Sequence, residues 1–272
     1  MMQLKDSMRF VENSVNGVVF MTAPNIKARH AFTTRCGGVS EGHLASLNLG
    51  SNRGDDLTRV IENYHRLGAA VGVDVERMAF TKQVHGSVVR IATEQDVHIL
   101  GTAVPYEADG LVTNVPGLAL ICFTADCVPV LLCDDRNGVI GAIHCGWRSS
   151  VADILGNAVA QMASLGAEPE RINAAIGPAI GYCCFEVGPE VIEAATAWLG
   201  GDLDGLYRAN PEREGKYYLD LRGANARRLI QLGLPPEHIA VSDECTVCSH
   251  EKYWSHRYTK GQRGSQGAVI QL

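Results

Sequence analysis

Hydrophobic and polar positions repeat along the chain with two periods, which predict helices and strands in alternation. Residues 55–73 place apolar side chains three or four positions apart behind acidic capping candidates, and residues 151–166 repeat this pattern before a terminal glycine. Further helices are predicted at 189–199 and 220–232. Apolar runs bounded by turn residues predict strands at 17–22, 30–35, 78–84, 87–92, 109–114, 118–124, 128–133, 138–145, 171–176, 238–242 and 267–271.

The order of these elements predicts an α+β (mixed α/β) protein. Its centre, from residue 78 to residue 145, is rich in strands joined by short turns, a pattern that favours antiparallel pairing. The sequence contains no low-complexity linker and no repeat. With 272 residues, 46% of them hydrophobic and 20% charged, the chain can form one large domain or two small ones with ordinary cores.

The charge of the chain limits the classes of partner that it is expected to bind. The formal net charge is −6 and the Lys and Arg residues are scattered, so the sequence lacks the basic surface that nucleic acid or an anionic membrane requires. Small molecules are the expected partners.

The first residues carry charges where a signal peptide needs its apolar core, and no stretch approaches the roughly 20 apolar residues of a membrane span. We therefore expect a cytoplasmic protein.

The nine cysteines are expected to be reduced thiols, because their number is odd and the chain is neither small nor evidently secreted. Three of them lie within apolar strand patterns and are expected in the core: Cys122, Cys133 and Cys145. Cys245 and Cys248 form a single CxxC that a structural zinc ion could use, but the local sequence offers no second CxxC. Packing is the favoured role for this pair and for the adjacent Cys183 and Cys184.

Polar groups stand at the ends of otherwise apolar strands. His85 ends the run "AFTKQVH", Cys127 follows "FTAD", and His144 ends "GVIGAIH". A buried polar group costs about 1–3 kcal/mol unless it is hydrogen-bonded or coordinated. Zinc accepts imidazole and thiolate together, and three protein ligands with one open position are typical of catalytic zinc. Histidines satisfied at the surface or in the core fit the same spacing, so both interpretations stand.

Five sequence blocks together resemble the YfiH/YlmD family of purine nucleoside phosphorylases, formerly called multicopper polyphenol oxidases or laccase-domain proteins. The blocks are "HAFTTRCGGVSEGHLASLNLG", "TKQVHG", "ADGLVTNVPGLALICFTADCVPVLLCD", "GVIGAIHCGWRSS" and "IGPAIGYCCFEVG". The resemblance implies a single domain over residues 1–272 with a YfiH-like α+β fold, in which mixed, largely antiparallel sheets are flanked by helices. It also implies a zinc ion held by His85, Cys127 and His144.

The resemblance further implies phosphorolysis of adenosine, inosine and 5′-methylthioadenosine, together with hydrolytic deamination of adenosine. Two other classes of enzyme stay open. A Cys-His hydrolase would use Cys127 as nucleophile and His144 or His85 as base. A copper-dependent polyphenol oxidase (laccase) would need several His-rich copper sites, whereas the nine histidines are dispersed and form no His-x-His pair. Copper is retained as an alternative ion.

Three charged residues are candidates for the remaining chemistry. Phosphorolysis needs fixed positive charge for phosphate. Arg35 lies beside two glycines that allow backbone amides to approach an anion, and Arg148 lies at a strand-to-helix turn. Arg35 fits an ordinary surface position equally well. Asp126 precedes Cys127 and could either move protons as a general acid/base during deamination or orient a metal ligand.

Overall fold

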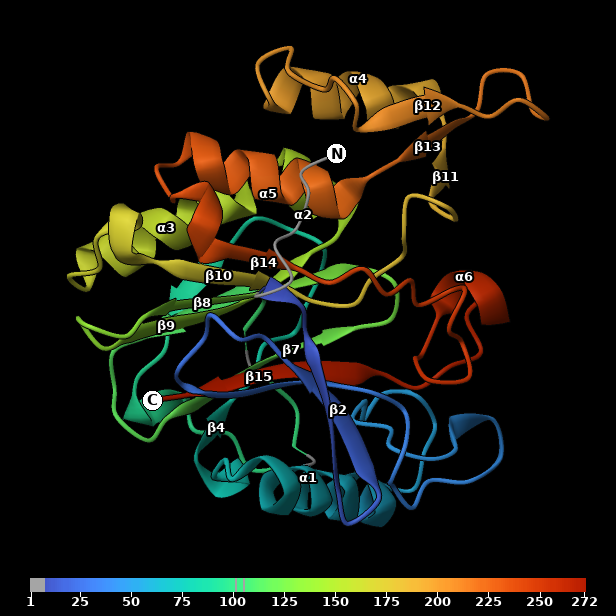
Figure 1. Cartoon of the computed structure of the whole chain (residues 1–272). Coiled ribbons are helices and arrows are strands. Elements are labelled where there is room, and N and C mark those ends of the chain that lie inside the picture. The colour runs from blue at the N-terminus through green and yellow to red at the C-terminus, as the bar shows by residue number, and fades with distance from the viewer. Residues whose placement is uncertain (1–7, 101, 105) are drawn as a thin grey trace.

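The computed structural model describes residues 8–100, 102–104 and 106–272; residues 1–7, which begin the charged N-terminal segment discussed above, lie outside this description. Two six-stranded sheets form its centre (Figure 1). The first sheet has the order β1 (Val11–Val15), β2 (Val18–Thr22), β3 (Arg29–Thr33), β15 (Gln266–Gln271), β7 (Ala119–Thr124) and β4 (Met78–Ala79). Its strands pair antiparallel, except that β4 runs parallel to β7.

The second sheet carries the longest hairpin of the protein. Its order is β14 (Ile239–Val241), β10 (Asn173–Ile176), β8 (Val128–Asp134), β9 (Val139–Cys145), β6 (Gly110–Thr113) and β5 (Val89–Ile91). The hairpin is β8–β9, whose seven residue pairs run from Val128 opposite Cys145 to Asp134 opposite Val139. Two pairs at the edges, β10–β14 and β5–β6, are parallel. The two sheets are therefore mixed and largely antiparallel.

The two sheets pack face to face, and this explains why their central strands are apolar at almost every position. In β8, Leu131 and Cys133 lie in the core between the sheets, whereas Val130 and Leu132 lie in the core under the helices. Both faces of the strand are thus buried. A strand buried on both faces has a continuous apolar sequence instead of an alternating one.

Helices cover the outer face of each sheet (Figure 1). α1 (Leu57–Val71) covers the first sheet; the Asp56 side chain caps its start, and it ends at Gly72, whose φ is 78°. The second sheet is covered by α3 (Ile154–Ser164) and α5 (Leu221–Gln231). Among the described residues, the other helical segments are α2 (Trp147–Val151), α4 (Pro189–Trp198), α6 (His256–Thr259) and the 3-10 turns η2 (Gly42–Leu44), η3 (Val75–Arg77), η4 (Glu94–Asp96), η5 (Pro169–Arg171) and η6 (Pro236–His238).

A third, small sheet lies beside α4 at the top of Figure 1. It consists of β11 (Glu186–Val187), β13 (Tyr217–Leu219) and β12 (Tyr207–Ala209), paired antiparallel. The sequence pattern predicted none of these strands, because each is two or three residues long and too short to show a periodic pattern. No helix in the described ranges is both long enough and apolar enough to cross a membrane.

The α+β class and the four long helices are confirmed, but one predicted strand is wrong in length. The strand expected at 78–84 ends after Ala79. Thr81, Lys82 and Gln83 instead line a cavity in an irregular segment. His85 consequently does not end a strand, as the sequence suggested, but lies in the loop between β4 and β5.

Candidate active site

The structure brings His85, Cys127 and His144 together from three separate segments. Cys127 lies in the three-residue connection through which the chain passes from β7 in the first sheet to β8 in the second. His144 lies in β9 beside the start of β8. The ligand atoms of the three residues all lie within 4.8 Å of one another, and Cys127 Sγ is 3.7 Å from His85 Nε2. The crossing point between the sheets thus gathers all three side chains.

Asp109 supports two of these residues at once, and the sequence analysis did not single it out. Its carboxylate is 1% exposed. Oδ1 accepts hydrogen bonds from His144 Nδ1 at 2.7 Å and from the His85 amide at 2.9 Å. Oδ2 accepts from the amides of Val84 and Gly86. A carboxylate on one ring nitrogen leaves the other nitrogen free to bind a metal. The only sequence signal was an acidic residue at the start of an apolar strand.

The electrostatics of the group favour a thiolate. Burial alone would raise the pKa of Cys127, but the charges of His144 and His85 and their hydrogen bonds outweigh it and lower that pKa from 9.0 to about 6. Burial would lower the pKa of His144, yet the Cys127 thiolate and the Asp109 carboxylate raise it from 6.5 to about 9. The protein therefore stabilises negative charge on the sulfur, the form in which cysteine binds metals.

The backbone around the three side chains adopts strained conformations and passes close to them. His85 and Asp126 both have left-handed backbone conformations, with φ of 60° and 88°. Such conformations cost about 1–3 kcal/mol in residues other than glycine and persist only where the surroundings hold them. A Cβ atom on Gly146 would lie 2.8 Å from the His85 ring and 3.4 Å from Cys127 Sγ. Glycine is required at position 146 because the chain passes directly against the group.

The three side chains open into a cavity of about 370 Å³, a size typical of sites for small molecules. Tyr64, Phe80, His98 and Phe123 form an aromatic wall, in which the ring centroids of Phe80 and Phe123 are 5.9 Å apart. The rest of the lining includes polar side chains such as Thr81. The cavity therefore combines a surface for a flat apolar ring with a group of candidate metal ligands.

Two arginines line the same cavity, and the sequence analysis identified neither. Arg53 Nε and Arg263 Nη1 both donate hydrogen bonds to the hydroxyl of Ser265. Arg263 Nε is buried without a hydrogen-bond partner among the described residues. Burial and the nearby charge of Arg53 lower the pKa of Arg263 from 12.5 to about 10. Two half-buried cations side by side at a cavity wall favour an anion between them.

The arginines that the sequence suggested lie elsewhere. Arg35 is outside the cavity lining; its guanidinium donates to the carbonyls of Ala45 and His250 and stacks on the Trp254 ring with 3.9 Å between the Cζ atom and the ring centroid. Arg148 is exposed, stacks on the neighbouring Trp147 ring and is also absent from the lining. The structure therefore does not bring these two residues to the three-residue group.

Asp126 is buried beside Cys127 but is turned toward a different loop. One of its carboxylate oxygens accepts a hydrogen bond from the Thr246 hydroxyl at 2.7 Å, and the other accepts one from the Arg257 amide at 2.6 Å. It does not line the cavity. Of the two roles considered for Asp126, this geometry suits the orientation of a ligand, because both oxygens are engaged by protein groups.

Comparison with known proteins assigns the chain to a protein family. The family described as multi-copper polyphenol oxidoreductase laccase matches residues 29–272. The chain belongs to this family. A purine nucleoside phosphorylase of Deinococcus radiodurans is 43% identical over 258 residues, which are 94% of each chain. The adenosine deaminase RL5 of an unknown prokaryotic organism is 35% identical over 240 residues, covering 86% of this chain and 90% of that protein.

The fold of this chain matches that of a solved structure of the family over nearly its whole length. The crystal structure of YlmD from Geobacillus stearothermophilus matches with a TM-score of 0.90 at 34% identity and covers 98% of this chain and 99% of that one. The resemblance to the YfiH/YlmD family and the predicted fold class are both confirmed. The family description mentions several coppers, but the described residues form two groups with metal-ligand geometry, and just one of them contains histidine.

Proposed function

We propose that this protein is a zinc-dependent purine nucleoside phosphorylase that acts on adenosine, inosine and 5′-methylthioadenosine and also deaminates adenosine, with the whole chain acting as one domain. Similarity to relatives that carry these names supports the proposal. The observation that carries it is that the Arg53–Arg263 pair and the His85–Cys127–His144 group face one cavity. A phosphorolytic site needs such a combination of anion binding and substrate polarisation.

Two imidazoles and one thiolate suit zinc, and the three ligands are those expected from the sequence: His85, Cys127 and His144. When bound, zinc would supply Lewis-acid chemistry at an open coordination position. Asp109 would hold His144 in the tautomer whose Nε2 is free for the ion. The protein's contribution at these three residues is to keep the sulfur ionised and the imidazole rings oriented.

In the same cavity, Arg53 and Arg263 would hold phosphate. In phosphorolysis, a phosphate oxygen forms a bond to C1′ of the ribose as the bond from C1′ to the purine nitrogen breaks. The purine leaves with the electron pair and takes up a proton. Two fixed guanidiniums keep the monoanionic or dianionic phosphate nucleophile in place without reorganisation. The wall formed by Phe80 and its aromatic neighbours would bind the purine ring.

Steady-state kinetics of Arg263→Ala test this assignment against the alternative of Arg148. We expect Arg263→Ala to raise the KM for phosphate at least tenfold and to impair phosphorolysis of inosine much more than deamination of adenosine, because deamination uses water and not phosphate. Arg148→Ala should leave the KM for phosphate within about twofold. A raised KM for phosphate in Arg148→Ala, together with normal kinetics in Arg263→Ala, would show that Arg148 binds phosphate. This result would refute the placement of the phosphate site in the cavity.

One observation also favours the Cys-His hydrolase. The lowered pKa of Cys127 and the chain of contacts from Cys127 through His144 to Asp109 match an activated thiol nucleophile. Elemental analysis separates the two functions, since a thiolate bound to zinc is a ligand and a poor nucleophile. Protein purified without added metal should contain zinc that Cys127→Ala loses. Copper in this position, or no metal together with a covalent Cys127 adduct, would overturn the zinc assignment.

A further inference from the structure

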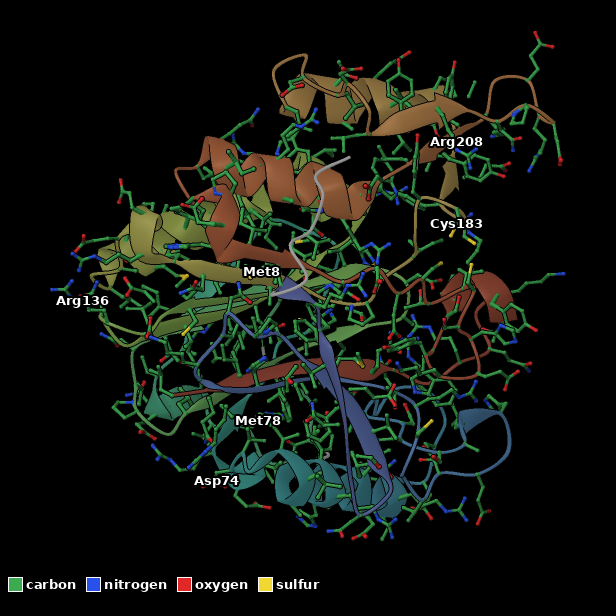
Figure 2. The ribbon with its side chains drawn as sticks, in the orientation of Figure 1. Met8, Asp74, Met78, Arg136, Cys183 and Arg208 are labelled. Carbon is green, nitrogen blue, oxygen red and sulfur yellow. The ribbon has the colours of Figure 1, made fainter. Side chains whose placement is uncertain are left out.

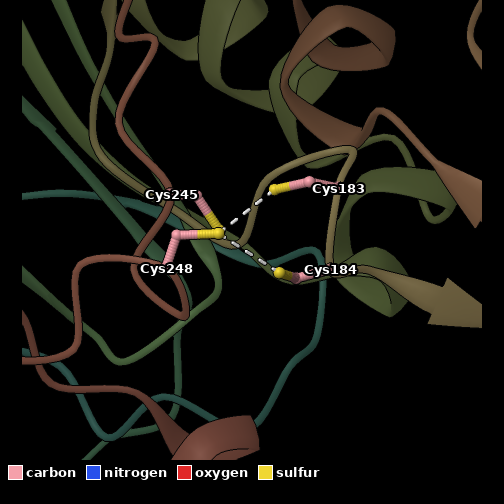
Figure 3. A group of neighbouring side chains, drawn as sticks. All are labelled: Cys183, Cys184, Cys245 and Cys248. Carbon is pink, nitrogen blue, oxygen red and sulfur yellow. Dashed lines mark hydrogen bonds between the residues drawn. The ribbon is translucent and has the colours of Figure 1, made fainter.

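Four cysteines lie together outside the candidate active site, in two loops far apart in sequence. Cys183 and Cys184 come from the loop after β10, and Cys245 and Cys248 come from the loop after β14 (Figure 3). Their sulfur atoms all lie within 4.8 Å of one another. Cys248 Sγ is 3.5 Å from the sulfur atoms of both Cys183 and Cys184.

The topology of the second sheet explains why the two loops meet. β10 and β14 are parallel neighbours, so both loops leave the same edge of the sheet. The pairing continues past the strand ends as a bridge between Ala179 and Cys245. Gly181 allows the final approach, because a Cβ atom there would lie 3.0 Å from Cys245 Cβ and 3.1 Å from Cys183 Sγ. The cluster is therefore built into the fold and does not depend on the CxxC alone.

The spacing of the sulfur atoms fits one tetrahedral ion. Zinc binds thiolates at about 2.3 Å, so the sulfur atoms of a tetrahedral four-thiolate site lie about 3.8 Å apart. Cys248 Sγ lies 3.5 Å from two of the other sulfur atoms and all four lie within 4.8 Å of one another, so one ion could contact all four. The Gly181 amide donates a hydrogen bond to Cys245 Sγ at 3.1 Å. Such amide hydrogen bonds to sulfur stabilise thiolates in metal sites.

We propose that Cys183, Cys184, Cys245 and Cys248 bind a second, structural zinc ion. Four protein ligands leave no open position, which distinguishes a structural site from a catalytic one. Cys183 and Cys248 are exposed, so the ion can enter from solvent (Figure 2 shows Cys183 at the surface). The proposal uses none of the residues of the candidate active site and stands independently of the proposed function.

The ion would fix the loops that border the candidate active site. Thr246, between the two cysteines of the CxxC, donates its hydroxyl to the carboxylate of Asp126, which adjoins Cys127. Arg257 donates its amide to the same carboxylate and its guanidinium to the carbonyl of Cys184. The cluster, Asp126 and Arg257 thus form one connected network. Binding of zinc would hold this network in place, while the chemistry would occur at the other ion.

Zinc content per chain, measured by elemental analysis of protein purified under reducing conditions without added metal, tests the proposal. We expect about two zinc ions in the wild type and about one each in Cys248→Ser and Cys127→Ala, because each substitution removes a ligand from a different site. The matched control is Cys36→Ser, which changes a half-buried cysteine outside both groups and should retain about two.

Cobalt substitution in the Cys127→Ala background keeps the test valid if Cys248→Ser does not fold. This variant should bind about one cobalt ion with the intense absorption of a four-thiolate tetrahedral site, and chelation should lower its melting temperature. A folded Cys127→Ala protein without zinc and without cobalt absorption would refute the site. Equal zinc in Cys248→Ser and the wild type, iron in place of zinc, or disulfides within the cluster in peptide maps would also refute it.

Discussion

Substitution of Asp109 by asparagine should weaken metal binding at the candidate active site by about 10- to 100-fold. The carboxylate has two oxygens, and each accepts two hydrogen bonds. Oδ1 holds His144 and the His85 amide, whereas Oδ2 holds the amides of Val84 and Gly86 on either side of His85. Asparagine keeps the shape but replaces one oxygen with an amino group, which accepts no hydrogen bonds. Whichever way it turns, either His144 or the loop that carries His85 loses support.

The same substitution should lower the free energy of unfolding. All four donors lose a charged acceptor and two of them lose their acceptor altogether. Hydrogen bonds to charged groups contribute about 1.5–3 kcal/mol each, so the expected loss is about 3 kcal/mol or more. The effect of the substitution on metal affinity therefore has to be distinguished from its effect on stability. Asp134 provides the control: its buried carboxylate also accepts four hydrogen bonds, two on each oxygen, at the far end of the β8–β9 hairpin. Figure 2 shows the neighbouring Arg136 at that tip.

Competition with a chromophoric chelator measures zinc affinity, and chemical denaturation of the metal-free proteins measures stability. Asp109→Asn should show both losses, whereas Asp134→Asn should lose stability alone. To isolate the active-site ion, both variants are compared in the Cys248→Ser background. Equal zinc affinity in the two variants would show that Asp109 does not orient the ligands and would refute the reasoning from its hydrogen bonds.

Two further predictions concern the same group. Gly146→Ala should bind zinc at least tenfold more weakly in the chelator competition, because its Cβ would lie 2.8 Å from the His85 ring; unchanged affinity would mean that the chain can move away at no cost. In the metal-free protein, alkylation of Cys127, followed by peptide mass spectrometry, should rise with pH through a midpoint near the lowered pKa of about 6. A midpoint near 9.0, the ordinary value for a thiol, would contradict the charge pairing with His144.

The sequence was sufficient for the four long helices and the central strands, but not for the way in which the fold brings their ends together. The helices and the long strands follow from periodicity, and strands that are apolar at every position indicate burial on both faces. The grouping of His85, Cys127 and His144 required the resemblance, because its geometry depends on the crossing of the chain from one sheet to the other. The irregular segment after Ala79 was missed since Phe80 and Val84 are as apolar as strand residues.

The sequence analysis missed Arg53 and Arg263 for a different reason. Arg53 lies in a turn-rich loop and Arg263 precedes the last strand, and neither position carries a local signal. They meet because Asn48 Oδ1 accepts a hydrogen bond from the Ser265 amide while the Leu49 amide donates to the Ser265 carbonyl. Contacts between residues more than 200 positions apart depend on sheet order, which periodicity does not determine. Arg35 and Arg148 had suitable neighbours in sequence but different partners in space.

Asp126 connects the two groups of candidate metal ligands. Its φ of 88° is unfavourable for a residue with a side chain, and a glycine would adopt it without strain. Asparagine or glycine would, however, lose one or both of the bonds to Thr246 and Arg257. The strained backbone directs the next residue, Cys127, toward His85, while the side chain anchors the turn to the loop of the four-cysteine cluster. The position of the Cys127 sulfur therefore depends on a loop that is itself outside the cavity.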